Sequence, residues 1–330
     1  MDTHFAVLPL DVVDSVVSQL NRTSLPTRFL RLPHPRTGIA SLFLPHQTDA
    51  SGGKRTSKIL EVQAVAPPNA RSWFMGDEVI SDGKLLVMTP VDPLFLLIPI
   101  LRTIKPRDGE TINFRPADDI FEEAAMKIAE MSRASSSQDA STLIELDDIT
   151  RFASLDCTMD AMKRICEVKE ITSEITVLRY SYEQLMRHLR KKVVTLSDPR
   201  ISEMSRSLTR SLAKDGLMDD KHEDLLDLGR RKLACELLAQ YLPQDIQEEL
   251  VGSYDFTKLD EHLKALQADQ MMVPPDNGAT AKNAKSASAT DDGSKKRKKD
   301  TKASQGVEKL KKANVSGMSK LSSFFSKKTG

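Results

Sequence analysis

Three pairs of neighbouring carboxylates are the side chains of this sequence that come closest to a reaction chemistry. They are Asp118-Asp119, Glu122-Glu123 and Asp147-Asp148. Phosphodiester hydrolysis by two metal ions needs several carboxylates that converge from separate elements onto ions roughly 4 Å apart. These pairs instead stand at predicted helix starts, where helix-dipole and solvated-face roles explain acidic side chains more simply. We therefore expect no catalytic residue in this chain.

The histidines and serines suggest no other chemistry. The histidines are scattered without the spacing of a metal site, most of them beside proline turns or on polar helix faces. They are His4, His34, His46, His188, His222 and His262. No arrangement of serine, histidine and acid can be argued from the sequence either. We expect neither an enzyme nor a bound metal or cofactor in this chain.

A run of five cations is the strongest charged motif. It consists of Lys295, Lys296, Arg297, Lys298 and Lys299. Such runs bind the acidic grooves of nuclear import receptors or the phosphates of nucleic acids, and a solubilising charge run is the plain alternative. The flanking residues are typical of a disordered segment, which would leave the run accessible. We therefore favour nuclear import and expect a nuclear protein.

The last residues contain an apolar motif. Leu321, Phe324 and Phe325 lie at i, i+3 and i+4, so one helical turn would bring their side chains together. This spacing resembles the PCNA-interacting box, in which Gln, an aliphatic residue and two aromatic residues are separated in the same way. Met318 takes the place of Gln, which predicts a lower affinity. The position at the end of an exposed tail favours PCNA binding over a chance apolar cluster.

A basic helix face is a candidate contact for nucleic acid. Arg187, His188, Arg190, Lys191 and Lys192 fall on one predicted helix, and Arg206 and Arg210 continue the positive charge in the next. Such a face can lie against phosphates. Most exposed basic faces are simply solvated, however, and residues 1–273 carry a net charge of −8. We expect at most a weak contact with a duplex.

Charge and composition divide the 330 residues into a body and a tail. Residues 274–330 have a net charge of +9, and 39% of the whole chain is apolar, which is enough for a core. Cys157, Cys166 and Cys235 lack paired spacing, so we expect buried free thiols in a reducing compartment. Since the sequence has no secretory signal and no apolar run near ~20 residues, we expect a soluble intracellular protein without membrane contact.

Short strands separated by proline and glycine turns are predicted through residues 5–88. They span residues 28–32, 39–44, 58–65, 72–75, 79–80 and 85–88. Asp82-Gly83 predicts a hairpin turn before the last strand. The pattern favours an antiparallel barrel or sandwich whose edge strands are completed by another protein chain. Trp73 and Phe74 would fill a core or a subunit interface.

Helical patterns begin at Asp92-Pro93. Asp92 is suited to cap a helix and Pro93 to its first turn. Residues 94–101 are apolar on every face, which predicts burial on all sides, and Pro99 should end or kink this helix. Further helices are predicted at 118–131, 160–168, 180–194, 199–215, 220–241 and 243–251. The predicted fold is α+β, with a β-rich part over residues 1–92, a helical part over 93–268 and a disordered basic tail over 269–330.

Taken together, these segments resemble the non-catalytic B subunit of eukaryotic type 2 ribonuclease H. The specific residues are Trp73, Phe74, Asp82, Gly83, Thr89, Pro90, Val91, Asp92 and Pro93, within SWFMGDEVISDGKLLVMTPVDPLFLLIPIL. The resemblance continues in YEQLMRHLRKKV, in RRKLACELLAQYLPQDIQEEL and in the terminal box, and spans most of residues 60–325. The insertion at residues 47–56 departs from the family.

The resemblance implies an N-terminal barrel that interlocks with the C subunit of that enzyme, and this barrel docks the catalytic A subunit. It also implies a winged-helix-like domain in the helical part and a tail that reaches PCNA. The heterotrimer would remove RNA from RNA:DNA hybrids and ribonucleotides embedded in DNA, with Mg²⁺ in the catalytic partner. This chain lacks the Asp-Glu-Ala-Gly type run of that partner. The alternative is a chromatin-associated winged-helix adaptor that binds PCNA and DNA without a nuclease, in which residues 1–100 would fold alone.

Overall fold

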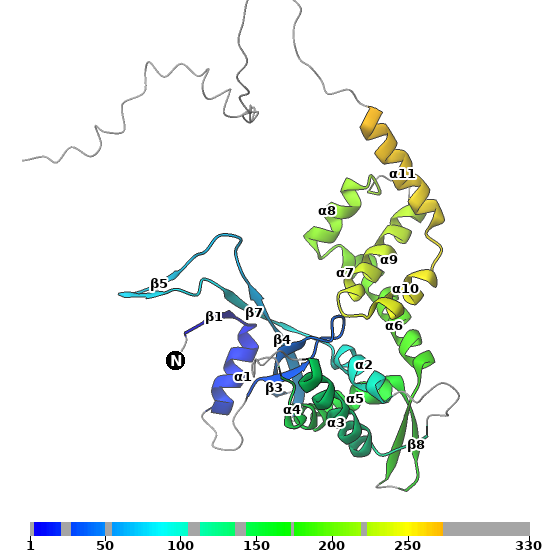
Figure 1. Cartoon of the computed structure of the whole chain (residues 1–330). Coiled ribbons are helices and arrows are strands. Elements are labelled where there is room, and N and C mark those ends of the chain that lie inside the picture. The colour runs from blue at the N-terminus through cyan, green and yellow to red at the C-terminus, as the bar shows by residue number, and fades with distance from the viewer. Residues whose placement is uncertain are drawn as a thin grey trace, which may run out of the picture. The chain divides into compact units, whose positions relative to one another are not determined.

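The computed structural model describes residues 3–20, 28–49, 55–104, 113–135, 143–172, 175–218 and 223–272. Contacts gather residues 1–274 into one compact unit. Within it a β-sheet formed by the N-terminal part is followed by a predominantly helical part, so the predicted α+β class is confirmed (Figure 1). The motifs at residues 295–299 and 318–325 lie outside the described residues.

The N-terminal part forms an open five-stranded sheet. Its strands are β1 (Phe5–Val7), β2 (Leu30–Pro33), β3 (Ala40–Asp49), β4 (Arg55–Val65) and β7 (Leu85–Pro90), in the spatial order β1-β7-β4-β3-β2. The neighbours are antiparallel as predicted, except that β1 runs parallel to β7. The edge strands β1 and β2 do not pair with each other. The barrel expected from the sequence is therefore not closed by the described strands.

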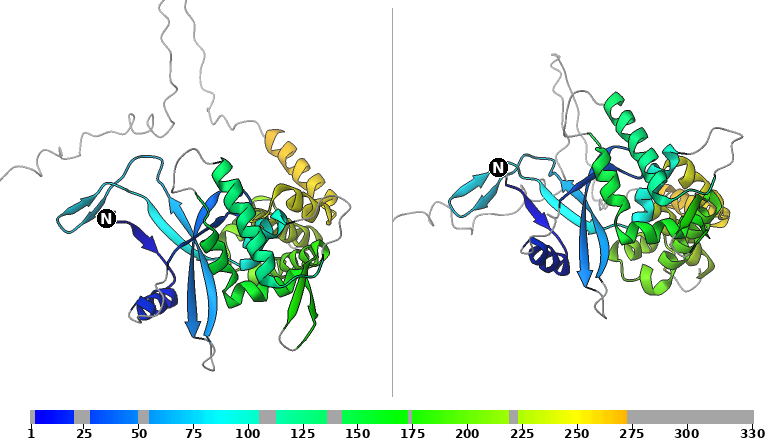
Figure 2. Two further views of the ribbon diagram at one scale, coloured as in Figure 1. Left: turned by 60° about the horizontal axis from the view of Figure 1, so that its bottom comes forward. Right: turned by 90° about the horizontal axis from the view of Figure 1, so that it is seen from below.

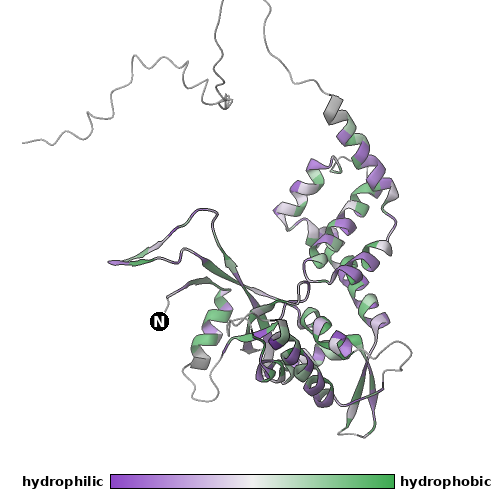
Figure 3. Ribbon diagram, viewed as in Figure 1, coloured by the Kyte–Doolittle hydropathy of each residue, from purple (hydrophilic) through white to green (hydrophobic). Residues whose placement is uncertain are grey.

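Helix α1 (Leu10–Leu20) lies in a region for which only strands were predicted. Its buried residue Val12 packs on Leu44, Leu60 and Met88 of the sheet, in a small second core. Figure 3 shows that much of α1 is hydrophobic. The helical spacing of its apolar residues, which gathers them on one face, outweighs the preference of valine for strands.

Two short strands, β5 (Trp73–Met75) and β6 (Glu78–Ile80), pair only with each other. Their turn is Gly76-Asp77, and Gly76 has a φ of +59°, which favours glycine. The hairpin predicted at Asp82-Gly83 is wrong, because β6 pairs with β5 whereas β7 pairs with β4 and β1. Gly83 is instead needed for close packing, since a Cβ atom there would lie 2.2 Å from the carbonyl oxygen of Arg71.

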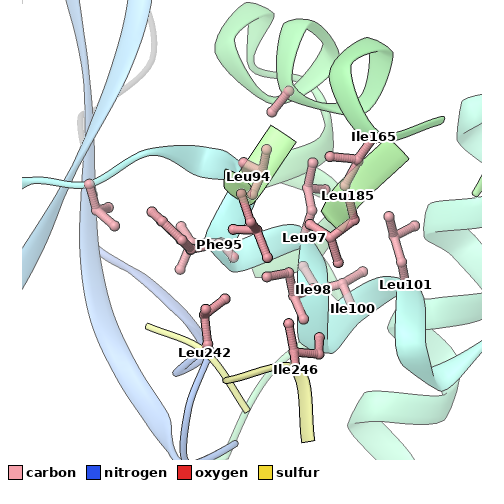
Figure 4. Close-up of a cluster of buried hydrophobic side chains, with 14 of the residues drawn as sticks. Leu94, Phe95, Leu97, Ile98, Ile100, Leu101, Ile165, Leu185, Leu242 and Ile246 are labelled. Carbon is pink, nitrogen blue, oxygen red and sulfur yellow. The ribbon is translucent and has the colours of Figure 1, made fainter. Parts of the chain in front are cut away.

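Helix α2 (Pro93–Thr103) is the buried centre of the helical part (Figure 4). The Asp92 side chain accepts a hydrogen bond from the Leu94 N–H at 3.0 Å, as predicted for a helix cap. The buried residues cover all faces of the helix and are Leu94, Phe95, Leu96, Leu97, Ile98, Ile100 and Leu101. Pro99 does not end the helix, because this packing on all sides offsets the hydrogen bond that proline cannot donate.

The remaining helices are α3 (Ala117–Ser135), α4 (Leu146–Ala153), α5 (Asp156–Ile165), α6 (Tyr182–Ser197), α7 (Pro199–Ser202), α8 (Arg206–Lys214), α9 (Glu223–Ala239), α10 (Gln244–Gly252) and α11 (Thr257–Met272). Of these, α3 and α5 contact α2 directly, and the helical part lies on one side of the sheet (Figure 2). The predicted helices exist, but the one starting at Pro199 is split into α7 and α8. The helix start predicted at Asp147-Asp148 is confirmed by α4, although its end was not predicted. Helix α11 was not predicted and extends past residue 269, where disorder was expected.

A hairpin of β8 (Cys166–Glu170) and β9 (Thr176–Tyr180) follows α5 directly. The helix predicted over residues 160–168 therefore ends earlier, at Ile165. Arg115 adds an isolated bridge to Leu178 on this hairpin. Each strand has only five residues, and β9 buries two neighbouring residues, Val177 and Leu178, in place of the alternation by which a strand is recognised.

The carboxylate of Asp92 joins the end of the sheet to two helices. It lies 2.8 Å from Nη2 of Arg164 on α5 and 2.5 Å from Nζ of Lys192 on α6. Burial by itself would raise the pKa of Asp92, but the hydrogen bonds from Arg164 and Lys192 lower it to about 2. Lys192 also lies over the ring of Phe95, 5.5 Å from its centroid. We call Asp92, Arg164 and Lys192 the Asp92 clamp.

Two further polar contacts connect the sheet with the helices. Arg28, just before β2, lies 2.7 Å from the buried carboxylate of Asp148 on α4. Tyr241, which follows α9, donates a hydrogen bond of 2.7 Å to the buried Glu61 of β4. Burial would raise the pKa of Glu61, yet hydrogen bonds from His34 and Tyr241 lower it. The helical part is thus held on the sheet by ionic contacts as well as by apolar packing.

Replacing Asp92 by Asn tests the Asp92 clamp. The amide oxygen still caps α2, but Arg164 and Lys192 lose their counter-charge, so we expect the free energy of unfolding to fall by about 2–3 kcal/mol in urea titrations. The contribution of Asp92 is present above the pKa of 3.8 expected for the unfolded chain and is lost as pH falls toward the folded pKa of about 2. The variant should lack this part of the acid dependence.

Glu123→Gln is the matched control. Glu123 of α3 pairs at the surface with Lys127, one turn along the same helix, and with Arg115 just before the helix. Surface pairs contribute roughly 0–1 kcal/mol, so this variant should lose less stability than Asp92→Asn. An equal loss in both variants would show that the position of Asp92 has no special role.

Candidate interaction surfaces

The β5–β6 hairpin carries an exposed apolar face. Phe74 is 81% exposed and Val79 61% exposed, and the two residues are directly paired in the hairpin register. The hairpin extends away from the helical part after residue 92 in both views of Figure 2. Large apolar side chains gathered at such a site are typical of a surface that binds another protein.

Trp73 fixes the base of this hairpin. Its ring lies 5.0 Å from the ring of Phe5 in β1, measured between centroids, and its Nε1 donates a hydrogen bond of 3.1 Å to the carbonyl oxygen of Lys84. Successive residues of a strand point to opposite faces, so Phe74 points away from these contacts. The sequence grouped Trp73 with Phe74; in the structure Trp73 supports the hairpin and Phe74 is available to a partner.

The outer edge of β1 has no neighbour among the described strands. Val7 at the end of β1 is 52% exposed. An unpaired strand edge offers backbone N–H and C=O groups to a further strand. We call β1, β5 and β6 together the open edge. The sequence did not predict a role for Met75, Val79 or Val7. The one sequence signal that could have pointed to them as surface residues is the shortness of their strands.

The other residues of the recognisable motif build the turn from β7 into α2. Asp82 accepts a hydrogen bond from the Lys84 N–H at 3.1 Å. Thr89 and Pro90 end β7, and the N–H of the buried Val91 donates to the carbonyl oxygen of Ile59 at 3.1 Å. With Asp92 and Pro93 these residues position α2 rather than a reactive group.

The acidic pairs do not converge. Asp118 and Asp119 lie in the first turn of α3, whereas Asp147 and Asp148 lie in the first turn of α4. Asp148 contacts Arg28 and the N–H of Arg31, although burial raises its pKa. Within the described part of the chain, no three side chains of the metal-ligating types are grouped so that they could hold an ion.

The cysteines are free thiols. Cys166 and Cys235 are buried and Cys157 is half-buried. Burial raises the pKa of Cys166 to about 12. The pKa of Cys235 is raised to about 11, and burial is the largest cause. Both thiols therefore stay protonated at neutral pH, and packing is their role.

Helices α4 and α5 followed by the β8–β9 hairpin have the order of a helix-turn-helix with a wing. In DNA-binding proteins of this kind the second helix enters the major groove with its N-terminal residues near the bases. Here α5 packs between α2, α6 and β4, and its buried residues are Thr158, Ala161, Met162 and Ile165. At its N-terminal end the Cys157 N–H donates to Oγ of Ser57 on β4 at 2.9 Å. The end of α5 that such proteins direct at the bases is thus bound to the sheet.

The predicted basic face of α6 is divided. Lys192 is bound in the Asp92 clamp, and Arg187 lies 2.7 Å from Glu183. Arg190 and Lys191 form no ion pair with a described residue, and both are exposed. The four cations thus do not act as a unit, and a nucleic-acid contact by them stays a prediction.

The import run and the terminal box are not part of the described residues, so their roles also remain predictions. No helix in the described ranges is both long and apolar enough to cross a membrane.

Two family models match consecutive parts of the chain. The "Ydr279p protein triple barrel domain" matches residues 11–92. The "Ydr279p protein family (RNase H2 complex component) wHTH domain" matches residues 95–251. The first match ends at Asp92, and the helix-turn-helix with its wing falls inside the second. The fold is therefore that of a triple-barrel domain followed by a winged helix-turn-helix domain.

Similar proteins from yeast and animals match most of this chain over most of their own length. The chain is 25% identical to the ribonuclease H2 B subunit of Schizosaccharomyces pombe, over 94% of this chain and 98% of the relative. It is 29% identical to that of Xenopus laevis, over 91% and 86%, and 25% identical to that of Homo sapiens, over 90% and 85%. The chain belongs to the Ydr279p family of ribonuclease H2 B subunits, which are components of that complex.

Proposed function

We propose that this chain is the scaffold of a heterotrimeric ribonuclease H2. Its open edge pairs with strands of the C subunit to complete a shared barrel, and this barrel docks the catalytic A subunit. The observation that carries the proposal is the open edge itself, where an unpaired strand lies beside a hairpin with Phe74 81% exposed. A protein that folded for itself alone would cover such a surface.

In this assembly the chemistry belongs to the catalytic partner. That partner holds Mg²⁺ and cleaves RNA in RNA:DNA hybrids and at ribonucleotides embedded in DNA. Several described carboxylates of the present chain are instead used in structure, as with Asp92, Asp148 and Glu61, each of which bonds a residue of another element. The contribution of this chain to hydrolysis is to hold and place the catalytic partner.

The tail directs the complex to the nucleus and to PCNA. Lys295, Lys296, Arg297, Lys298 and Lys299 would direct it to the nucleus, and Met318, Leu321, Phe324 and Phe325 would dock on PCNA. Aromatic and aliphatic side chains one helical turn apart can fill an apolar pocket together. The catalytic partner would then be tethered at replicating DNA.

Phe74→Asp tests the open edge. A carboxylate cannot be buried in a barrel interface without a large desolvation cost, so we expect the variant chain to lose co-purification with both partner proteins. Because Phe74 is already exposed, the melting temperature of the isolated chain should stay within about 2 °C of the original. Met204→Asp is the control, since Met204 is 84% exposed but lies between α7 and α8. The scaffold proposal fails if both variants assemble normally.

A tail peptide tests the terminal box by calorimetry with PCNA. Replacing Phe324 and Phe325 by Ala should abolish measurable binding, because both aromatic anchors are lost. Replacing the intervening Ser322 and Ser323 by Ala should change affinity less than about threefold. Met318→Gln should strengthen binding by restoring a polar contact. Unchanged affinity of the double Phe variant would reject the tether.

A further inference from the structure

Helix α8 carries three cations on one face. Arg206, Arg210 and Lys214 stand at i, i+4 and i+8, and the helix contains no acidic residue. All three side chains belong to exposed residues. The spacing places successive cations about 6 Å apart along the axis, on a stripe that turns slowly around the helix. We call these residues the α8 stripe.

The opposite face of α8 is fixed by close packing. Leu212 is buried, and a Cβ atom added at Gly229 of α9 would lie 3.0 Å from Cδ2 of Leu212 and 2.7 Å from Cδ1 of Leu217. Glycine at this position lets α8 and the following turn lie tightly on α9. The α8 stripe is therefore held facing solvent.

The charge of the α8 stripe is not neutralised by ion pairs. None of its three side chains pairs with an acidic side chain in the part of the chain that the structure describes. The preceding acid, Glu203, is bound to Arg230 at 2.8 Å, and Asp227 also contacts Arg230. Asp215 directly follows α8 and adjoins the stripe in sequence. A positive surface with little compensation attracts anions.

The winged-helix elements lack such a surface. On the wing Arg179 is paired with Glu167 and lies 4.5 Å from the ring centroid of Phe114. Apolar residues are exposed near the wing tip, with Val168 45%, Ile171 54% and Ile175 50% exposed. One face of helix α5 is covered by α2, α6 and β4. Phosphate binding thus has no support at the position used by DNA-binding winged helices.

We infer that the α8 stripe binds the phosphate backbone of the duplex on which the complex acts. Its three cations span about 12 Å, which matches about four phosphates of one strand at about 3.4 Å of axis per phosphate. Contacts of this kind position a protein without reading sequence. The inference rests on the proposed function and deepens it, since the duplex is the proposed substrate. It assigns the phosphate contact to α8 rather than to α5 and the wing.

The test uses the complex of this chain with its two partner proteins. Residues 295–299 are replaced by Ala in every sample, so that the cations of the tail do not contribute. Binding of a fluorescent RNA:DNA duplex is followed by anisotropy between about 50 and 300 mM salt. The test variant is Arg206→Gln, Arg210→Gln and Lys214→Gln combined. The matched control is Arg133→Gln, Lys163→Gln and Lys169→Gln combined, which removes three exposed cations from α3, α5 and the wing.

We expect the α8 variant to bind at least about tenfold more weakly at about 100 mM salt, with a salt slope smaller by about 2–3. The control should bind as the parent complex does. A loss in the control alone would place the duplex on the winged helix, and equal binding in all samples would show that the α8 stripe takes no part; either result overturns the inference. Co-purification of the three proteins, scored first, distinguishes this failure from a failure of the scaffold proposal.

Discussion

The burial of α2, with the charge of Asp92 at its first turn, is the constraint on which the rest of the structure depends. A helix that is apolar on every face has to be enclosed, and here the sheet and the later helices enclose it together. Asp92 sets the orientation of this packing, because its carboxylate caps α2 while it binds Arg164 of α5 and Lys192 of α6. The two parts of the chain thus share one core and one half-buried ionic site.

This shared core explains the use of the winged helix. Packing of α5 against α2 and β4 buries one face of the recognition helix, and Ser57 bonds to its N-terminal end. The winged-helix elements thereby pack against the sheet and stabilise its position. Two surfaces remain for partners. They are the open edge in the N-terminal part and the α8 stripe in the helical part, and neither belongs to the helix-turn-helix.

Local patterns predicted much of the fold. The cap at Asp92, the buried helix after it and the main helices were all visible as periodicity and capping residues, because these signals lie within a few residues of one another. The hairpin was misplaced, since Asp82-Gly83 has the favoured turn composition whereas Gly76-Asp77 makes the turn. The sequence cannot show that Gly83 is required by the backbone of Arg71.

The candidate surfaces were harder to predict, because they depend on contacts between residues far apart in the chain. The pairing of Arg28 with Asp148 joins positions 120 residues apart, and the capture of Lys192 by Asp92 removes a cation that looked free in its own helix. Phe74 was recognised as part of the motif, but only the structure separates it from Trp73. Helix α5 cannot read DNA bases because its N-terminal end packs on β4. This contact joins distant parts of the chain, so no local sequence pattern predicts it.

Hydrogen–deuterium exchange of the full chain, alone and assembled with its two partner proteins, tests the central claim most directly. The account predicts that amides of α2 and α5 are protected in the isolated chain and change little on assembly, whereas β1, β5 and β6 exchange fast alone and become protected in the complex. Fast exchange of α5 in the isolated chain, or an open edge that stays unprotected after assembly, would contradict it.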